Sequence, residues 1–223
     1  MSIVRALRIA GLLFAATLAN GAAYASDNPA MDAQVKHIND EWARIKYQMK
    51  GRANQYDQID ALSKQAAIVT THYPGRAEPL LWQGIVNSEE AAMAGTFSKM
   101  GYASSARDIL EKARAINPKA ANGGVLMSLG VLYYKVPGFP IGFGSSGKAR
   151  NYLEAALAMD PTGLDANFFY GDFLAAQGEV AKARNYLLRA LKAPSDPDRP
   201  VWDVGRRGEV RQLLADLDKK SRH

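Results

Sequence analysis

Cysteine is absent from the sequence. Its absence excludes disulfides, thiolate metal sites and thiol nucleophiles, and it also excludes a lipid-modified cysteine as a membrane anchor. Histidine is scarce, and His37, His72 and His223 are widely separated. A zinc site usually needs several histidine or cysteine ligands held close together. The sequence therefore predicts no metal site and no cofactor, and the fold must depend on its hydrophobic core.

Long apolar runs are also lacking, apart from residues 9–18. Arg5 and Arg8 precede this run, and the small-residue motif A-Y-A follows it at residues 23–25. Because a helix that spans a bilayer needs about 20 apolar residues, the run is too short for a membrane anchor and is typical of a secretory signal peptide. We expect residues 1–25 to be removed and the mature chain, with no transmembrane segment, to be released into a bacterial periplasm.

The sequence also lacks the signals of nucleic-acid binding and of catalysis. The 28 Lys and Arg residues exceed the 22 Asp and Glu residues only modestly, and no long basic block occurs. No G-x-S-x-G elbow is present. Glu89 and Glu90 form an adjacent acidic pair, but consecutive helical residues point about 100° apart, so we expect solvated charges that share no proton. The sequence predicts no catalytic residues and no enzyme.

Internal repetition is the strongest positive signal. Three segments share the pattern A-R-x-x-L-x-x-A followed by proline, at residues 106–118, 149–161 and 183–194. The spacing places the alanines and the leucine on one helical face, and the proline stops each helix. The residues concerned are Ala106, Leu110, Ala113 and Pro118; Ala149, Leu153, Ala156 and Pro161; and Ala183, Leu187, Ala190 and Pro194.

Each of these helices follows another apolar helix that carries a single interior glycine among large residues. The three glycines are Gly84, Gly130 and Gly171. An interior glycine costs a helix roughly 1 kcal/mol relative to alanine, so its recurrence needs a reason. We predict that a second helix packs there too closely for a β-carbon.

Two helices per unit with this pattern of small residues resemble the tetratricopeptide repeat (TPR). The resemblance implies an all-α, TPR-like α-solenoid of antiparallel helix pairs, with one domain over residues 26–223. We expect repeats at about 77–118, 122–161 and 164–194. Amphipathic helices near residues 31–49 and 55–72 should form an N-terminal helical hairpin, and residues 203–220 should form a C-terminal capping helix.

The first and middle units have extra residues between the glycine and the first alanine. On a solenoid, these two insertions should emerge on the same side. The middle one contains GFGSSGKA at residues 142–149, which nearly matches two phosphate-binding motifs. It lacks the required strand and has Ala149 at the hydroxyl position, so we interpret it as a turn in which Ser145 or Ser146 caps the next helix. A small anion or carboxylate at that helix start stays an alternative.

Candidate binding residues follow from the repeat frame, because the first helices of such repeats line the concave surface. Phe139, Pro140, Ile141 and Phe143 make the middle insertion unusually apolar; we expect it to fold over the helices, with a partner contact as the alternative. We also expect Asp165, Asp203 and Arg206, with their neighbours Asp172 and Arg207, to link the last repeat to its cap by ion pairs. The predicted binding residues are Trp82, Val131, Tyr134, Phe139, Phe143, Phe168 and Asp172.

The resemblance implies an exported, non-enzymatic scaffold that binds another periplasmic or envelope protein, or a peptide, and leaves a homo-oligomer open. The order of elements resembles more distantly the T-component family of tripartite ATP-independent periplasmic (TRAP) transporters, some of whose members have a lipidation cysteine that is missing here. That resemblance implies an alternative function, in which an accessory protein assists capture of a small organic solute in a helical cavity. The matching positions are Trp82, Leu129, Gly130, Tyr133, Tyr134, Gly144, Lys148 and Ala149.

Overall fold

The computed structural model describes residues 27–220, in which the chain forms nine helices arranged as an all-α solenoid of antiparallel pairs. The fold class predicted from the sequence is therefore confirmed. The predicted signal peptide, residues 1–25, lies outside the described residues. The helices are α1 (Pro29–Gln48), α2 (Arg52–His72), α3 (Ala77–Met93), α4 (Thr96–Ile116), α5 (Ala120–Lys135), α6 (Ser146–Met159), α7 (Leu164–Ala176), α8 (Val180–Leu191) and α9 (Pro200–Lys220).

The recurrent glycines lie where the two helices of a pair approach most closely. A β-carbon on Gly84 would come within 2.5 Å of the Leu110 side chain, and one on Gly130 within 2.6 Å of Leu153. Gly171 faces Leu187 in the same way, at 3.0 Å. Each repeated leucine is fully buried, so it fills the space that the missing side chain leaves. The prediction of close packing at these glycines is confirmed.

The expected insertion in the first unit is wrong. Only Ala94 and Gly95 separate α3 from α4, so the extra residues form additional helical turns rather than a loop. The physical reason lies in residues 88–105, which are rich in alanine, serine and other residues that a helix accommodates and which contain no proline. The two units with extra residues thus differ, and only the middle one carries a long loop.

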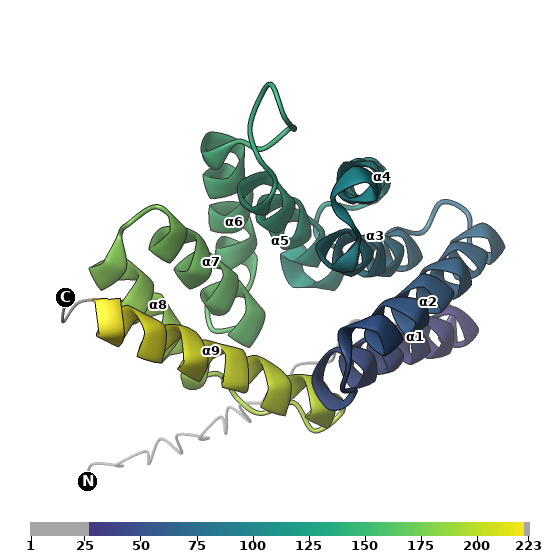
Figure 1. Cartoon of the computed structure of the whole chain (residues 1–223). Coiled ribbons are helices and arrows are strands. Elements are labelled where there is room, and N and C mark those ends of the chain that lie inside the picture. The colour runs from purple at the N-terminus through teal and green to yellow at the C-terminus, as the bar shows by residue number, and fades with distance from the viewer. Residues whose placement is uncertain (1–26, 221–223) are drawn as a thin grey trace, which may run out of the picture.

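That loop occupies residues 136–145, between α5 and α6, and we call it the finger. It stands out from the molecule on the side opposite α9 (Figure 1). The Ser145 hydroxyl accepts a hydrogen bond from the Lys148 backbone N–H at 3.3 Å, so Ser145 is the N-cap of α6. The predicted helix cap is confirmed, with Ser145 rather than Ser146 in the capping role.

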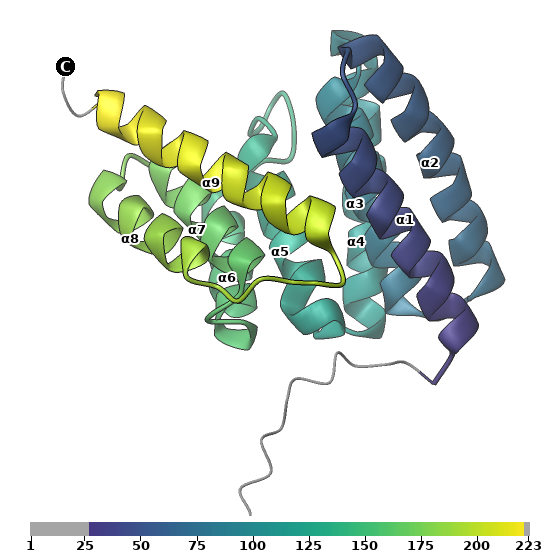
Figure 2. The same cartoon turned by 90° about the horizontal axis from the view of Figure 1, so that it is seen from below.

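Helix α9 extends further than a simple terminal cap. It packs against α8 and α7 and continues to the opposite end of the solenoid, where it packs against α1 (Figures 1 and 2). Gly205 permits this contact, because a β-carbon there would overlap the ring of Tyr47 on α1. Trp202 and Val210 are buried in the same core. The last helix therefore bridges the two ends of the curved array and joins the first helix to the last repeat.

Candidate functional site

Two regions concentrate the predicted binding residues. One is the concave side of the solenoid, formed by α1, α3, α5 and α7 and spanned by α9. The other is the finger, which projects away from it (Figure 1). Their chemistry differs, because the concave side is rich in charged and aromatic groups that contact one another, whereas the tip of the finger is apolar and exposed.

Arg206 connects α9 to the last repeat on the concave side. Its side chain is only 4% exposed, and its guanidinium forms an ion pair with Asp165 of α7, at 2.6 Å between Nε and Oδ1. The same group lies 4.8 Å from the ring centre of Phe168 and 4.5 Å from that of Phe169. Burial is the largest single influence on the pKa of Arg206 and would lower it, but Asp165, Tyr47 and Glu209 together outweigh burial and raise the pKa above its usual range.

The predicted ion-pair link between the last repeat and the cap therefore exists, and Arg206 with Asp165 makes it. Arg207 binds in a different way. It pairs with Asp203 within α9, at 2.9 Å, and donates to backbone carbonyls at the end of α8, including Leu191 at 3.0 Å. These bonds satisfy carbonyl groups that a helix end leaves without intrahelical partners.

Asp172 belongs to a second cluster, between α5 and α7. The Tyr134 hydroxyl donates to its carboxylate at 2.7 Å, and the Lys135 ammonium pairs with it at 2.7 Å. Burial and the adjacent carboxylate raise the pKa of Tyr134 well above its usual value, so the phenol stays protonated as a hydrogen-bond donor. The structure thus brings together Tyr134 and Asp172, which were predicted only to face the same surface.

Trp82 lies nearer the first hairpin. Its ring packs edge-on against Trp42 of α1, at 5.9 Å between ring centres, and the guanidinium of Arg199 lies 6.0 Å from it. Val131 is partly buried against the core. Trp82 and Val131 are therefore on the concave helices but are not in the cluster of Tyr134 and Asp172.

The finger has a fixed base. The Gly144 N–H donates to the Pro137 carbonyl at 2.9 Å, and the Ser145 N–H donates to the Tyr133 carbonyl at 2.8 Å. Phe143 turns back toward the helices, where its ring packs edge-on against Tyr133 at 5.6 Å between ring centres. Backbone bonds and one aromatic anchor thus hold both ends of the finger against α5.

The tip of the finger does not fold over the helices, so that expectation is wrong. Phe139 is 94% exposed and Ile141 is 72% exposed. The Ile141 and Gly142 N–H groups both donate to the Gly138 carbonyl, at 3.1 Å each, which closes a tight turn at the tip. Phe139 and Ile141 both lie within this turn and are exposed. Phe143, in contrast, does pack against the helices.

The solvated acidic pair was also a wrong expectation. Glu90 is only 2% exposed and lies between α2, α3 and α4, and Glu89 forms an ion pair with Lys46 at 2.9 Å. Burial raises the pKa of Glu90, and hydrogen bonds from Ser63 and Tyr102 oppose that rise only in part. The sequence offered no signal of this, because the residues that surround Glu90 come from three helices.

Sequence reasoning placed Ile141 in the apolar insertion without naming it among the binding residues, and it missed Lys135 and Arg199. Ile141 had an available signal, since it lies two residues from Phe139 in the same apolar loop. Lys135 and Arg199 had none, because their partners Asp172 and Asn39 are distant in the sequence. Among residues 27–220, no group of three histidine or acidic side chains could hold a metal ion. No helix in this range is both long and apolar enough to cross a membrane.

Antiparallel helix pairs joined by glycine–leucine contacts define a helical-repeat scaffold. Residues 142–200 match the model of the tetratricopeptide repeat family, and this segment contains α6, α7 and α8. No curated protein matches the chain. This part of the chain is thus similar in sequence to the tetratricopeptide repeat, and such repeats generally bind protein partners.

The chain is also similar to several solved structures. TTC0263, a thermophilic TPR protein of Thermus thermophilus, is 15% identical with a TM-score of 0.56, over 84% of this chain and 90% of that chain. The MamA RS-1 ArsTM double mutant is 14% identical with a TM-score of 0.44, over 86% and 98% of the two chains. PilF of Pseudomonas aeruginosa is 15% identical with a TM-score of 0.34, over 85% and 89%. TTC0263 therefore supports the fold, and at this identity the likeness concerns the fold alone.

Proposed function

We propose that this chain is an exported, non-enzymatic scaffold that binds another protein of the bacterial envelope through the tip of the finger. The observation that carries the proposal is the exposure of Phe139 and Ile141 on a loop whose base is fixed by hydrogen bonds. Aromatic side chains dominate the energetics of many interfaces, and a loop that is already ordered loses little conformational entropy on binding.

The concave side is less suited to binding a protein partner than the finger is. Arg206 fills part of it from within the chain, and its contacts with Asp165 and Phe168 are intramolecular. A protein partner would have to compete with α9 for these groups. Tyr134 and Asp172 stay a predicted binding surface, and we place them second to the finger because each already has a partner.

A photo-crosslinking amino acid at Phe139 tests the proposal in cells. Val204 of α9, which is 71% exposed, is the matched control because it is a large apolar residue on another surface. We expect a protein adduct at position 139 and none at position 204. Replacing Phe139 and Ile141 together by Asp should weaken capture of that protein at least about tenfold without changing the unfolding temperature. Unchanged capture by the double variant would contradict the role of the finger.

Export to the periplasm is a separate part of the proposal and has its own test. If the signal peptide is cleaved after Ala25, the N-terminal sequence of protein recovered from the periplasmic fraction begins at Ser26. Protein that stays in the cytoplasmic fraction with residues 1–25 attached would contradict export. This result decides localisation without reference to the finger.

The T-component hypothesis is the second candidate function. One observation favours it: α1 and α2 line an open hollow of about 340 Å³ with a largely apolar lining, a size that suits a small organic ligand. Native mass spectrometry of the purified protein should then show a bound organic compound. Protein that is free of ligand, together with a gene location far from transporter genes, would count against this alternative.

A further inference from the structure

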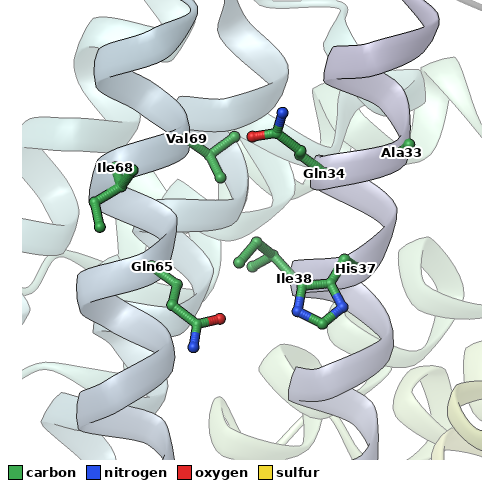
Figure 3. Close-up of a pocket in the computed structure, with 7 residues that line it drawn as sticks. All are labelled: Ala33, Gln34, His37, Ile38, Gln65, Ile68 and Val69. Atoms are coloured by element: carbon green, nitrogen blue, oxygen red, sulfur yellow. The ribbon is translucent and has the colours of Figure 1, made fainter.

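The hollow between α1 and α2, which we call the hairpin groove, is the second unfilled apolar feature of the described chain. Ile38 and Val69 are its buried floor, while Ile68 is 55% exposed at its edge (Figure 3). The side chain of Gln34 is held by a hydrogen bond to the Tyr73 hydroxyl at 2.8 Å. Apart from one histidine, the residues that line the groove carry no titratable side chain: Ala33, Gln34, His37, Ile38, Gln65, Ile68 and Val69.

The position of the groove explains why it is open. A solenoid buries the apolar face of each helix pair against the next pair, so a terminal pair needs a polar outer face or a cap. Helix α3 packs against both α1 and α2, and α9 packs against α1. The groove is lined by α1 and α2 alone. The other described helices therefore leave this groove, with Ile68 exposed at its edge, uncovered at the start of the array.

The finger has the complementary chemistry, since it exposes two large apolar side chains, Phe139 and Ile141, at its tip. It cannot fill the groove of its own chain, because α3 and α4 lie between the finger and the first hairpin (Figure 1). A cavity of about 150 Å³ already accommodates a benzene ring. The hairpin groove, at about 340 Å³, has room for the ring of Phe139 with the Ile141 side chain beside it.

We propose that the finger of one molecule inserts Phe139 and Ile141 into the hairpin groove of a second copy of this chain. The inference rests on the proposed role of the finger as a protein-binding element and names its partner. The two surfaces are different, so the contact is head-to-tail and leaves one free finger and one free groove on every pair. Further copies can add at these free sites, which produces larger assemblies as the concentration rises.

The contact is a weak one. Two inserted side chains with their surroundings bury less area than the roughly 1,200–2,000 Å² of a standard stable interface. Association should therefore be in fast exchange and depend strongly on protein concentration. Sedimentation velocity of the purified protein, from the low micromolar to the millimolar range, measures it directly. We expect the mean mass of the wild-type protein to rise across this range.

The discriminating experiment uses one variant for each surface. Phe139→Asp removes the finger contact but keeps the groove, and Ile68→Glu places a charge at the groove but keeps the finger. Both positions are exposed, so neither variant should alter folding, and circular dichroism checks this. Each variant alone should stay monomeric. An equimolar mixture should form a dimer and nothing larger, because one intact finger and one intact groove are present.

Val204→Glu is the matched control, since it places the same charge on an exposed apolar position of α9. It should assemble as the wild-type protein does. Wild-type protein that stays monomeric throughout, or a mixture of the two variants that stays monomeric, would overturn the proposal. If Phe139 nevertheless forms a crosslink to a different envelope protein in cells, self-association fails while the proposed function stands. Crosslinking of position 139 to a position in α1 or α2 of a second copy would support both.

Discussion

The closure of the solenoid by α9 makes a sharp prediction about two glycines in that helix. Gly205 and Gly208 lie one turn apart, and alanine at either position gains helix propensity, by about 0.5–1 kcal/mol. Their surroundings differ. No atom lies within 4 Å of a β-carbon built on Gly208, whereas one built on Gly205 would overlap the ring of Tyr47.

The Tyr47 ring has little freedom to move aside. It packs edge-on against Trp42, at 6.0 Å between ring centres, and its hydroxyl donates to Glu209 at 3.2 Å. Forcing a methyl group into a packed region typically costs about 1–3 kcal/mol. We therefore expect Gly205→Ala to lower the free energy of unfolding by about 1–2 kcal/mol and Gly208→Ala to raise it by about 0.5–1 kcal/mol.

Urea denaturation followed by circular dichroism measures both changes. Hydrogen exchange adds local information: in Gly205→Ala, protection should fall in α9 and in the facing part of α1, and it should stay unchanged in α4 and α6. A Gly205→Ala protein as stable as Gly208→Ala, with unchanged protection in α1, would refute the packing of α9 against the first helix.

Three further predictions concern the repeats. Ser145→Ala should cost about 1 kcal/mol because it removes the N-cap of α6, whereas Ser146→Ala should change stability little; urea denaturation of both variants tests the assignment. Glu90→Gln should become more stable relative to wild type as the pH rises above 4.5. The reason is that the folded protein, in which the pKa of Glu90 is raised, is stabilised only while this carboxyl is protonated, and that stabilisation is lost as the pH passes through the raised pKa. Denaturation at several pH values measures the difference in stability, and a difference that does not change with pH would contradict the prediction. Gly130→Ala and Leu153→Ala should lower the free energy of unfolding by about 1–3 and 2–5 kcal/mol, respectively. The double variant should lose less than the sum of these two changes, because the new methyl group enters the space left by the leucine. A double-mutant cycle without coupling would contradict the contact.

Closure by α9 also bears on how a scaffold of this shape can act. An open solenoid offers its concave side to a partner, but here Arg206 and Trp202 reach into that side and are buried there. Removing Arg206 would leave Asp165 without its main counter-charge. The contact is therefore part of the fold as well as an obstacle to a ligand, which is why we assign partner binding to the finger.

The helical repeat could be predicted from the sequence because its signals are local. The spacing of Leu110, Leu153 and Leu187 places each on a helical face with small neighbours, and the following prolines end the helices. The glycine positions then predicted where a second helix packs closely, and the structure shows that the repeated leucines fill these places. Ser145 as a helix cap is equally local, since the hydroxyl reaches a backbone group three residues away.

The errors concern the two insertions and one buried carboxylate. The extra residues of the first unit gave no turn signal, whereas the insertion in the middle unit, rich in proline and glycine, did form a loop. The burial of Glu90 follows from the approach of α2 and α4 to α3. Whether Phe139 folded back or projected depended on a turn whose hydrogen bonds converge on the Gly138 carbonyl.

The sequence by itself determined the all-α class, the pairing of helices within each repeat and the absence of cysteine chemistry, because periodicity and composition act over one or two turns of chain. Only the tertiary structure decided that α9 returns to α1, that Arg206 pairs with Asp165 and that the finger and the hairpin groove stay unfilled. These contacts join residues far apart in the sequence, and their geometry follows from the curvature accumulated over the whole array, which no single repeat specifies.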